Sequence, residues 1–140
     1  METKNWIQAH VTQPVQDIGY GTLLTTAGMT ARIITGLSHY AGTNSAAATM
    51  SYFILPSQPP ESVAGGYNVA TQNGVKIFLH TGNLSTVNSA ANAFTSVGGT
   101  DRGGASPYLW LPPGYMLIAV VSDANLNGTV IHDIMTAEVC

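Results

Sequence analysis

The chain has 140 residues, of which 45% are hydrophobic and only 8% are Asp, Glu, Lys or Arg, whereas a soluble globular domain averages about 25% charged residues. This length fits one domain with a core of its own, and the lone cysteine, Cys140, excludes an intramolecular disulfide. Only four residues are Lys or Arg and the formal net charge is −3, so the chain has no basic patch for nucleic acid. The longest apolar run, Met116–Val121, is far shorter than the about 20 residues that a membrane span needs.

Uncharged polar residues, mainly Thr, Ser, Asn, Gln and Gly, take the place of the missing charges. Removing water from amides and hydroxyls is far less costly than removing it from ions. The composition therefore favours a surface that a protein partner covers, and we expect neither nucleic acid nor a membrane as partner. Residues 1–16 do not pair a basic region with an apolar stretch, so no cleaved secretion signal is expected.

The first eighteen residues differ from the rest of the chain. They contain Pro14, show no sustained alternation of apolar and polar residues, and include Trp6 and Ile7 among polar neighbours. We expect an extended N-terminal arm over residues 1–18 that lies on a neighbouring surface, and a β-sandwich domain over residues 19–140. The alternative interpretation is an ordinary first strand with a frayed end.

Beyond the arm, the dominant hydrophobic period is two, which is typical of half-buried β-strands. In the first such run, one face is expected to hold Ala31, Ile33 and Leu37. The runs are separated by most of the Gly and Pro residues and predict an all-β chain of about eight antiparallel strands, a β-sandwich or jelly roll. The predicted strands are Ala31–Leu37, Met50–Leu55, Tyr67–Thr71, Val75–Thr81, Tyr108–Leu111, Tyr115–Ser122 and Thr129–Val139.

Two turns and one loop have recognisable chemistry. Pro112-Pro113-Gly114 places Pro and Gly as a type II turn requires, and Asn127-Gly128 predicts a type I′ hairpin. Residues 97–106 are dense in glycine, which indicates an exposed loop. This loop contains Thr100, Asp101 and Arg102 and is either a contact loop or a plain linker between strands.

Motifs for catalysis or metal binding are not evident. Residues 123–128 match the first half of a calcium loop, but Ile134 occupies the position that needs a bidentate Glu, so a hairpin is favoured. His132 and Asp133 are adjacent in a predicted strand and should point to opposite faces, which prevents them from acting as a catalytic pair. A nucleophile motif and a phosphate-binding loop are also missing. We therefore expect no enzyme activity, no cofactor and no metal site.

The order of several segments resembles that of small β-sandwich virion structural proteins of tailed bacteriophages. The segments are Leu23–Thr26, Ala27–Ile34, Asn44–Met50 and Tyr108–Leu117. In that group a strand, a turn ending in Gly, an isoleucine-rich strand and an Asn-Ser or Asn-Thr loop come first, and a Leu-x-x-Gly-x-x-Leu hairpin comes late. The resemblance covers roughly residues 21–139, and Ala27-Gly28 stands where Pro-Gly is more usual.

The resemblance implies a capsid decoration (cement) protein, made in the host cytoplasm and placed on the outer surface of the virion. Its partner would be the lattice of the major capsid protein, and assembly as a homotrimer would strengthen weak contacts through effective concentration. The function would then be mechanical stabilisation of the shell. The residues expected to contact the partner are Trp6 and Ile7 in the arm and Thr100, Asp101 and Arg102 in the glycine-rich loop.

Other classes of protein fit the same composition. A receptor-binding or carbohydrate-binding module of a tail or fibre would use Trp110, Tyr108 and Tyr115 to stack on sugars. A head–tail adaptor subunit would assemble as a ring at one vertex of the particle. A small hydrolase would require a metal site that the sequence does not display.

Overall fold

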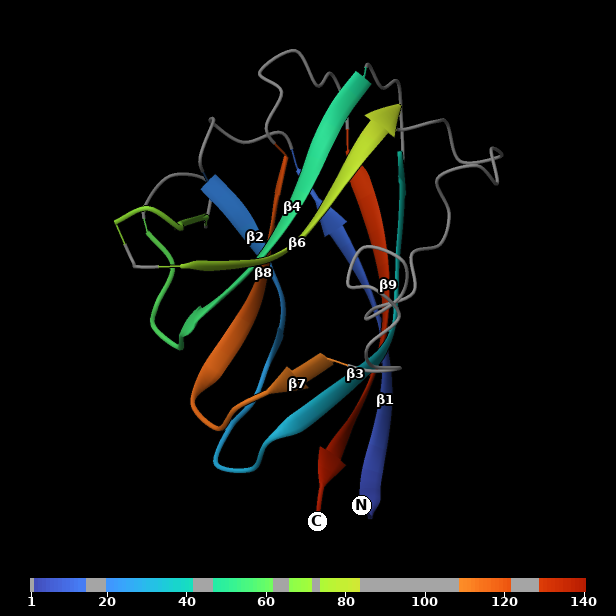
Figure 1. Cartoon of the computed structure of the whole chain (residues 1–140), viewed down its shortest axis with the longest axis vertical. Coiled ribbons are helices and arrows are strands. Elements are labelled where there is room, and N and C mark those ends of the chain that lie inside the picture. Colours follow the sequence, from blue (N-terminus) through green and yellow to red (C-terminus); the bar gives the residue numbers. More distant parts are fainter. Residues whose placement is uncertain are drawn as a thin grey trace.

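The computed structural model describes residues 2–14, 20–41, 47–61, 66–71, 74–83, 109–121 and 129–140. They form two antiparallel sheets packed face to face, in the orders β1-β9-β3-β7 and β5-β2-β8-β4-β6 (Figure 1). The expected all-β sandwich is confirmed, and the described part of the chain contains no helix, hence none able to cross a membrane. The strands are β1 (Thr3–Gln13), β2 (Tyr20–Thr26), β3 (Arg32–Ala41), β4 (Ala47–Pro56), β5 (Tyr67–Asn68), β6 (Val75–Asn83), β7 (Leu109–Leu111), β8 (Tyr115–Val121) and β9 (Val130–Val139).

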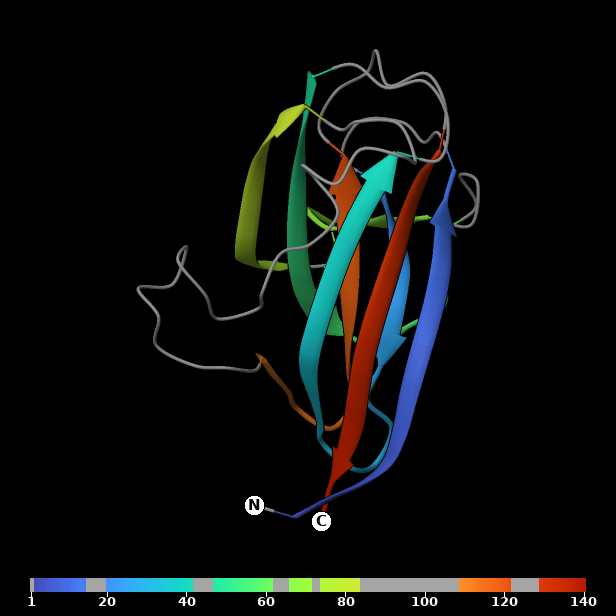
Figure 2. The ribbon, with the colours of Figure 1, turned by 90° about the vertical axis from the view of Figure 1, so that its right-hand side faces the viewer.

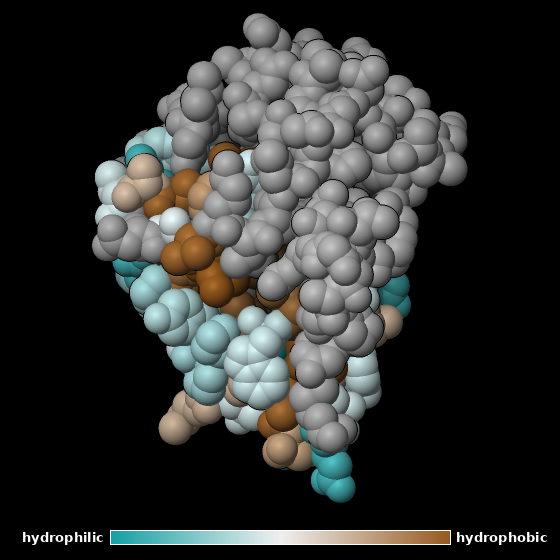
Figure 3. Space-filling view, in the orientation of Figure 1, coloured by the Kyte–Doolittle hydropathy of each residue, from teal (hydrophilic) through white to brown (hydrophobic). Residues whose placement is uncertain are grey.

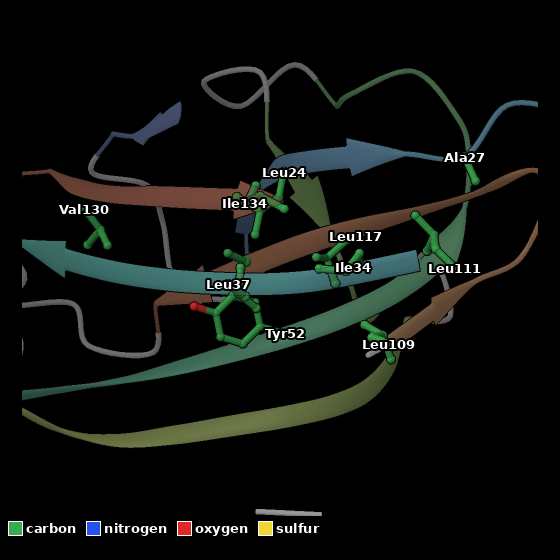
Figure 4. Packing of buried hydrophobic residues seen from close by; sticks show 11 residues of the cluster. Leu24, Ala27, Ile34, Leu37, Tyr52, Leu109, Leu111, Leu117, Val130 and Ile134 are labelled. Atoms are coloured by element: carbon green, nitrogen blue, oxygen red, sulfur yellow. The ribbon is translucent and has the colours of Figure 1, made fainter. Parts of the chain in front are cut away.

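The main hydrophobic core lies between the two sheets (Figure 4). It combines residues of β3, β7 and β9 from one sheet with residues of β2, β4 and β8 from the other, so folding of either sheet depends on the other. Its fully buried aromatic residue is Tyr52. The cluster consists of Leu24, Ala27, Ile34, Leu37, Tyr52, Leu109, Leu111, Leu117, Ala119, Val130 and Ile134.

A second cluster covers the other face of the five-stranded sheet. Its members are Leu55, Tyr67, Val69, Met116, Ile118 and Val120. Strand β8 is therefore buried on both faces, which explains why its sequence is a continuous apolar run and does not alternate. In the space-filling view, hydrophobic side chains reach the surface on the side of the molecule that carries β2, β5 and β8 (Figure 3).

The prediction that Ala31, Ile33 and Leu37 share one face of the strand is wrong. Ile34 and Leu37 point into the core, and a β-bulge between Ile34 and Gly36 in the pairing with β9 shifts the alternation by one residue. Ile33 lies on the outer face, opposite Ala137. The bulge explains how residues three apart in a strand come to share a face.

The turn at Pro112-Pro113-Gly114 is confirmed. Gly114 has a φ of +77°, as the third position of a type II turn requires, and the Tyr115 amide donates to the Pro112 carbonyl at 3.2 Å. The Gly114 amide also donates to the Gly28 carbonyl at 2.9 Å. The β7–β8 turn and the β2–β3 turn are thus tied together at one end of the sandwich. The expected hairpin at Asn127-Gly128 lies outside the described residues.

Strand β5 is shorter than the expected Tyr67–Thr71. The Asn68 side-chain oxygen accepts hydrogen bonds from the amides of Ala70 and Thr71, at 3.1 and 3.2 Å. An Asn that bonds the backbone two and three residues ahead turns the chain and ends the strand. Local side-chain chemistry therefore overrides the strand pattern after residue 68.

Residues 3–13, expected to belong to an arm, form β1 and pair with β9 at the edge of the four-stranded sheet. This pairing is the one expected of an ordinary first strand. The register shifts between Lys4 and Ile7, and this irregularity interrupts the alternation of apolar and polar residues that would indicate a strand. The boundary expected between residues 18 and 19 lies outside the described residues and stays a prediction.

Candidate partner-binding surface

The N-terminal half of β1 contains a β-bulge that presents Trp6. Lys4 pairs with Glu138 and Ile7 with Thr136, so two residues of β1, Asn5 and Trp6, lie opposite the single residue between them on β9. Asn5 has a φ of +52°, in the left-handed region that Asn tolerates better than most residues. The bulge thus depends on the residue type directly before Trp6.

A polar cluster anchors this bulge to the neighbouring strands. The buried guanidinium of Arg32 donates through Nη2 to Thr136 Oγ1 at 2.8 Å and to the Asn5 carbonyl at 3.4 Å. Its Nη1 lies 3.6 Å from Glu138 Oε1, and Asn5 Nδ2 donates to Glu138 Oε2 at 2.7 Å. A buried charge without partners is strongly unfavourable, so Arg32 requires these contacts. Moving any of its three partners would leave the guanidinium less well paired. Residues of β1, β9 and β3 therefore fix the backbone that carries Trp6.

Four residues form a line across the outer face of the four-stranded sheet, which we call the tryptophan row. Ile33 of β3 pairs with Trp110 of β7 on one side and with Ala137 of β9 on the other, and directly opposed residues share a face. Ala137 in turn lies opposite the bulge. Ile7 faces inward with Thr136, so the pleat places Trp6 outward. Figure 2 shows β3, β9 and β1 side by side on this face.

The two ends of the tryptophan row are exposed and its middle is not. The exposed fractions are 52% for Trp6 and 45% for Trp110, against 0% for Ala137 and 4% for Ile33. Trp6 and Trp110 lie on strands three spacings apart in the sheet, so their backbones are about 14 Å apart. Half-exposed Trp side chains on either side of a buried apolar centre suit contact with a protein or with stacked rings, because Trp is enriched at the centres of interfaces.

The row carries no charged side chain. The nearest ionisable pair described on the same face is His10 and Asp133, with Nδ1 and Oδ1 2.6 Å apart. Both side chains are exposed to water, so this pair adds little stability of its own. A partner that covers the tryptophan row would therefore remove water mainly from apolar surface.

The structure places only part of the predicted contact set. Trp6 and Ile7 are exposed, Trp6 on the outer face and Ile7 on the inner side of the β1 edge, with 49% exposure. Thr100, Asp101 and Arg102 lie outside the described residues.

Among the aromatic residues named as stacking candidates, Trp110 joins Trp6 in the row. Tyr115 begins β8 in the other sheet, and Tyr108 lies outside the described residues. That Ile33 and Ala137 connect the two tryptophans could not be predicted, because the order of strands in a sheet does not follow from the hydrophobic pattern of one chain.

The expectation for His132 and Asp133 is confirmed. His132 is buried between the sheets with Nε2 2.7 Å from Gln13 Oε1, while Asp133 faces outward toward His10. Within the described ranges, no three His, Cys, Asp or Glu side chains gather as a metal ion would need.

Comparison with known proteins gives no relative from which a function could be transferred. No protein-family model matches the chain, and no match was found among curated proteins or solved structures.

Proposed function

We propose that this protein is a structural virion protein of a tailed bacteriophage, a capsid decoration (cement) protein that binds the head shell and stabilises it. The uncharged tryptophan row, with its two exposed indoles, is the observation that carries this proposal. The order of sequence segments and the β-sandwich fold support it as well. The partner is then the major capsid protein lattice, and the protein resides on the outer surface of the capsid.

The size of the row indicates how such a protein would attach. A Trp side chain has an area of up to about 250 Å², and Trp6 and Trp110 are each about half exposed. Together they offer roughly 250 Å² of surface, or about 6 kcal/mol of hydrophobic free energy before the loss of rotational and translational freedom is counted. That loss is of similar size, so one copy would bind weakly. Several linked copies on a repeating lattice would bind firmly, which favours an oligomer.

Rebinding to particles that lack the protein tests the proposal. Purified wild-type protein should bind such particles saturably, and Trp6→Ala and Trp110→Ala should each weaken binding by at least about tenfold, because each removes about half of the row's exposed apolar area. Val75→Ala is the matched control, since Val75 is 60% exposed but lies in β6 of the other sheet. Failure of the wild type to bind, or equal binding by all four proteins, would contradict the proposal.

The same row supports a second candidate, a carbohydrate-binding module of a tail or fibre. Two exposed indoles at the ends of a row without charged side chains are suited to stack on sugar rings. In that case Trp6→Ala and Trp110→Ala would abolish glycan binding in solution, and the protein would not rebind to the shell. Binding to glycans and binding to shells therefore separate the two candidates.

A further inference from the structure

Strand β1 is a long edge with one paired side. It runs for 11 residues at the margin of the four-stranded sheet, whereas the opposite margin is formed by β7, with three. Within the described ranges only β9 pairs with β1, and Figure 2 shows β1 along one side of the molecule. An edge of this length presents backbone N–H and C=O groups on which another strand can form hydrogen bonds.

The usual protections of an edge strand lie only at the two ends of β1. Lys4 and the bulge occupy its beginning, and Pro14 follows its last residue. Between them, Ile7–Gln13 keeps an uninterrupted register with β9 and contains no Asp, Glu, Lys, Arg or Pro. The one ionisable side chain in this stretch, His10, is already bonded to Asp133 of its own chain. We call Ile7–Gln13 the open edge.

We propose that the open edge binds the open edge of a second copy of this chain, antiparallel, about a twofold axis at His10. The pairing is self-complementary in this register. Gln8 faces Thr12 of the second copy on the outer face, where both side chains can hydrogen-bond, and Ala9 faces Val11 of the second copy on the inner face. The two His10 side chains meet at the axis, each held by its own Asp133. No pair of fixed like charges is created, and the two four-stranded sheets become continuous.

This arrangement places the outer faces of both copies on the same side. Directly opposed residues of antiparallel strands share a face, so the tryptophan rows of the two copies lie on one continuous surface. The twofold contact gives a dimer, in place of the trimer expected from the sequence. Doubling the row would raise the effective concentration of binding groups for any repeating partner. The dimer itself does not depend on what that partner is.

Charge variants test both the contact and its register. Gln8 and Thr12 are exposed and lie four residues apart on one face, so charges placed there are about 13 Å apart within one chain but adjacent across the axis. In the variant Q8K/T12K, the Lys at position 8 of each copy faces the Lys at position 12 of the other, and this repulsion should weaken dimerisation by up to about tenfold. The variant Q8K/T12E sets Lys against Glu twice and should dimerise at least as well as the wild type.

Sedimentation velocity over a range of concentrations measures these effects on the purified protein, with circular dichroism to verify folding. M29K/T30K, which adds two charges in the β2–β3 turn, is the control and should dimerise like the wild type. A monomeric wild type would overturn the proposal, and so would an oligomer that Q8K/T12K leaves intact or that both edge variants weaken equally. Because no particle is present, these results are independent of the rebinding assay.

Discussion

Gln13 and His132 connect the two sheets through one buried amide. Gln13 Nε2 donates to the Ala119 carbonyl of β8 at 2.9 Å, and its Oε1 lies 2.7 Å from His132 Nε2 of β9. With the amide oriented in this way, His132 must carry its proton on Nε2 and donate it. The His132 ring also meets Tyr52 of β4 edge to face, with ring centroids 6.1 Å apart. The last residue of β1 is therefore fixed to both layers of the sandwich.

Gln13→Ala should destabilise the fold by about 2 kcal/mol, because it removes the hydrogen bonds at both ends of a buried amide. Urea unfolding followed by circular dichroism measures this loss. Thr12→Ala, at the exposed neighbouring position of β1, should change the free energy of unfolding by less than about 0.5 kcal/mol. Equal stability of the two variants would show that the amide does not hold the sheets together.

The stability of the protein should fall as the pH rises above 10. Burial raises the pKa of Tyr52 well above its ordinary value of 10.0, so the folded protein keeps a proton that the unfolded chain releases. The free energy of unfolding then decreases with pH, for this group by up to about 1.4 kcal/mol per pH unit. In Tyr52→Phe this part of the slope should disappear, whatever the variant's stability at neutral pH. Identical slopes for the two proteins between pH 10 and the onset of alkaline unfolding would contradict the assignment to Tyr52.

The bulge at Asn5 should tolerate Gly better than Ala. Asn5→Ala loses the hydrogen bond to Glu138 and places an ordinary L residue at positive φ, which costs about 1 kcal/mol beyond the lost bond. Asn5→Gly loses the same bond without the backbone penalty. Thermal unfolding should rank the wild type first, Gly second and Ala third. An Ala variant as stable as the Gly variant would indicate that Asn5 does not hold the left-handed conformation in solution.

Replacing Gly21 by Ala should destabilise the fold, whereas replacing Gly28 by Ala should not. A Cβ atom at Gly21 would lie 2.5 Å from Ile118 Cγ2 and 2.6 Å from the Ala119 carbonyl oxygen, whereas none of the surroundings comes within 4 Å at Gly28. Gly21→Ala is therefore expected to destabilise the fold by about 2 kcal/mol or more through overpacking. Gly28→Ala serves as the control and should leave the denaturant midpoint nearly unchanged. A Gly21→Ala variant with the wild-type midpoint would contradict the packing of β2 on β8.

The sequence predicts the class of fold well because strand periodicity and turn chemistry are local. The segment Thr129–Val139 alternates and becomes β9, and Pro112-Pro113-Gly114 makes the expected turn. The prediction for the face of β3 is wrong because the bulge depends on pairing with β9, which lies about 100 residues away along the chain.

The candidate surface was predictable only in part. The sequence shows Trp6 among mostly polar neighbours and Trp110 between two leucines, but it does not show that the two align, because their alignment follows from the strand order β1-β9-β3-β7. That order brings together segments that are far apart in the chain. The anchoring of the bulge by Arg32 could not be predicted either, because the sequence does not indicate that this cation is buried.

The most direct test of the proposed role is to locate the protein in purified virus particles, by quantitative mass spectrometry together with cryo-electron microscopy of the same sample. A decoration protein should be present in many copies over the whole shell, with the tryptophan row against the capsid lattice. Absence from the particles, or presence only as a single ring at one vertex or at the tail, would contradict this role.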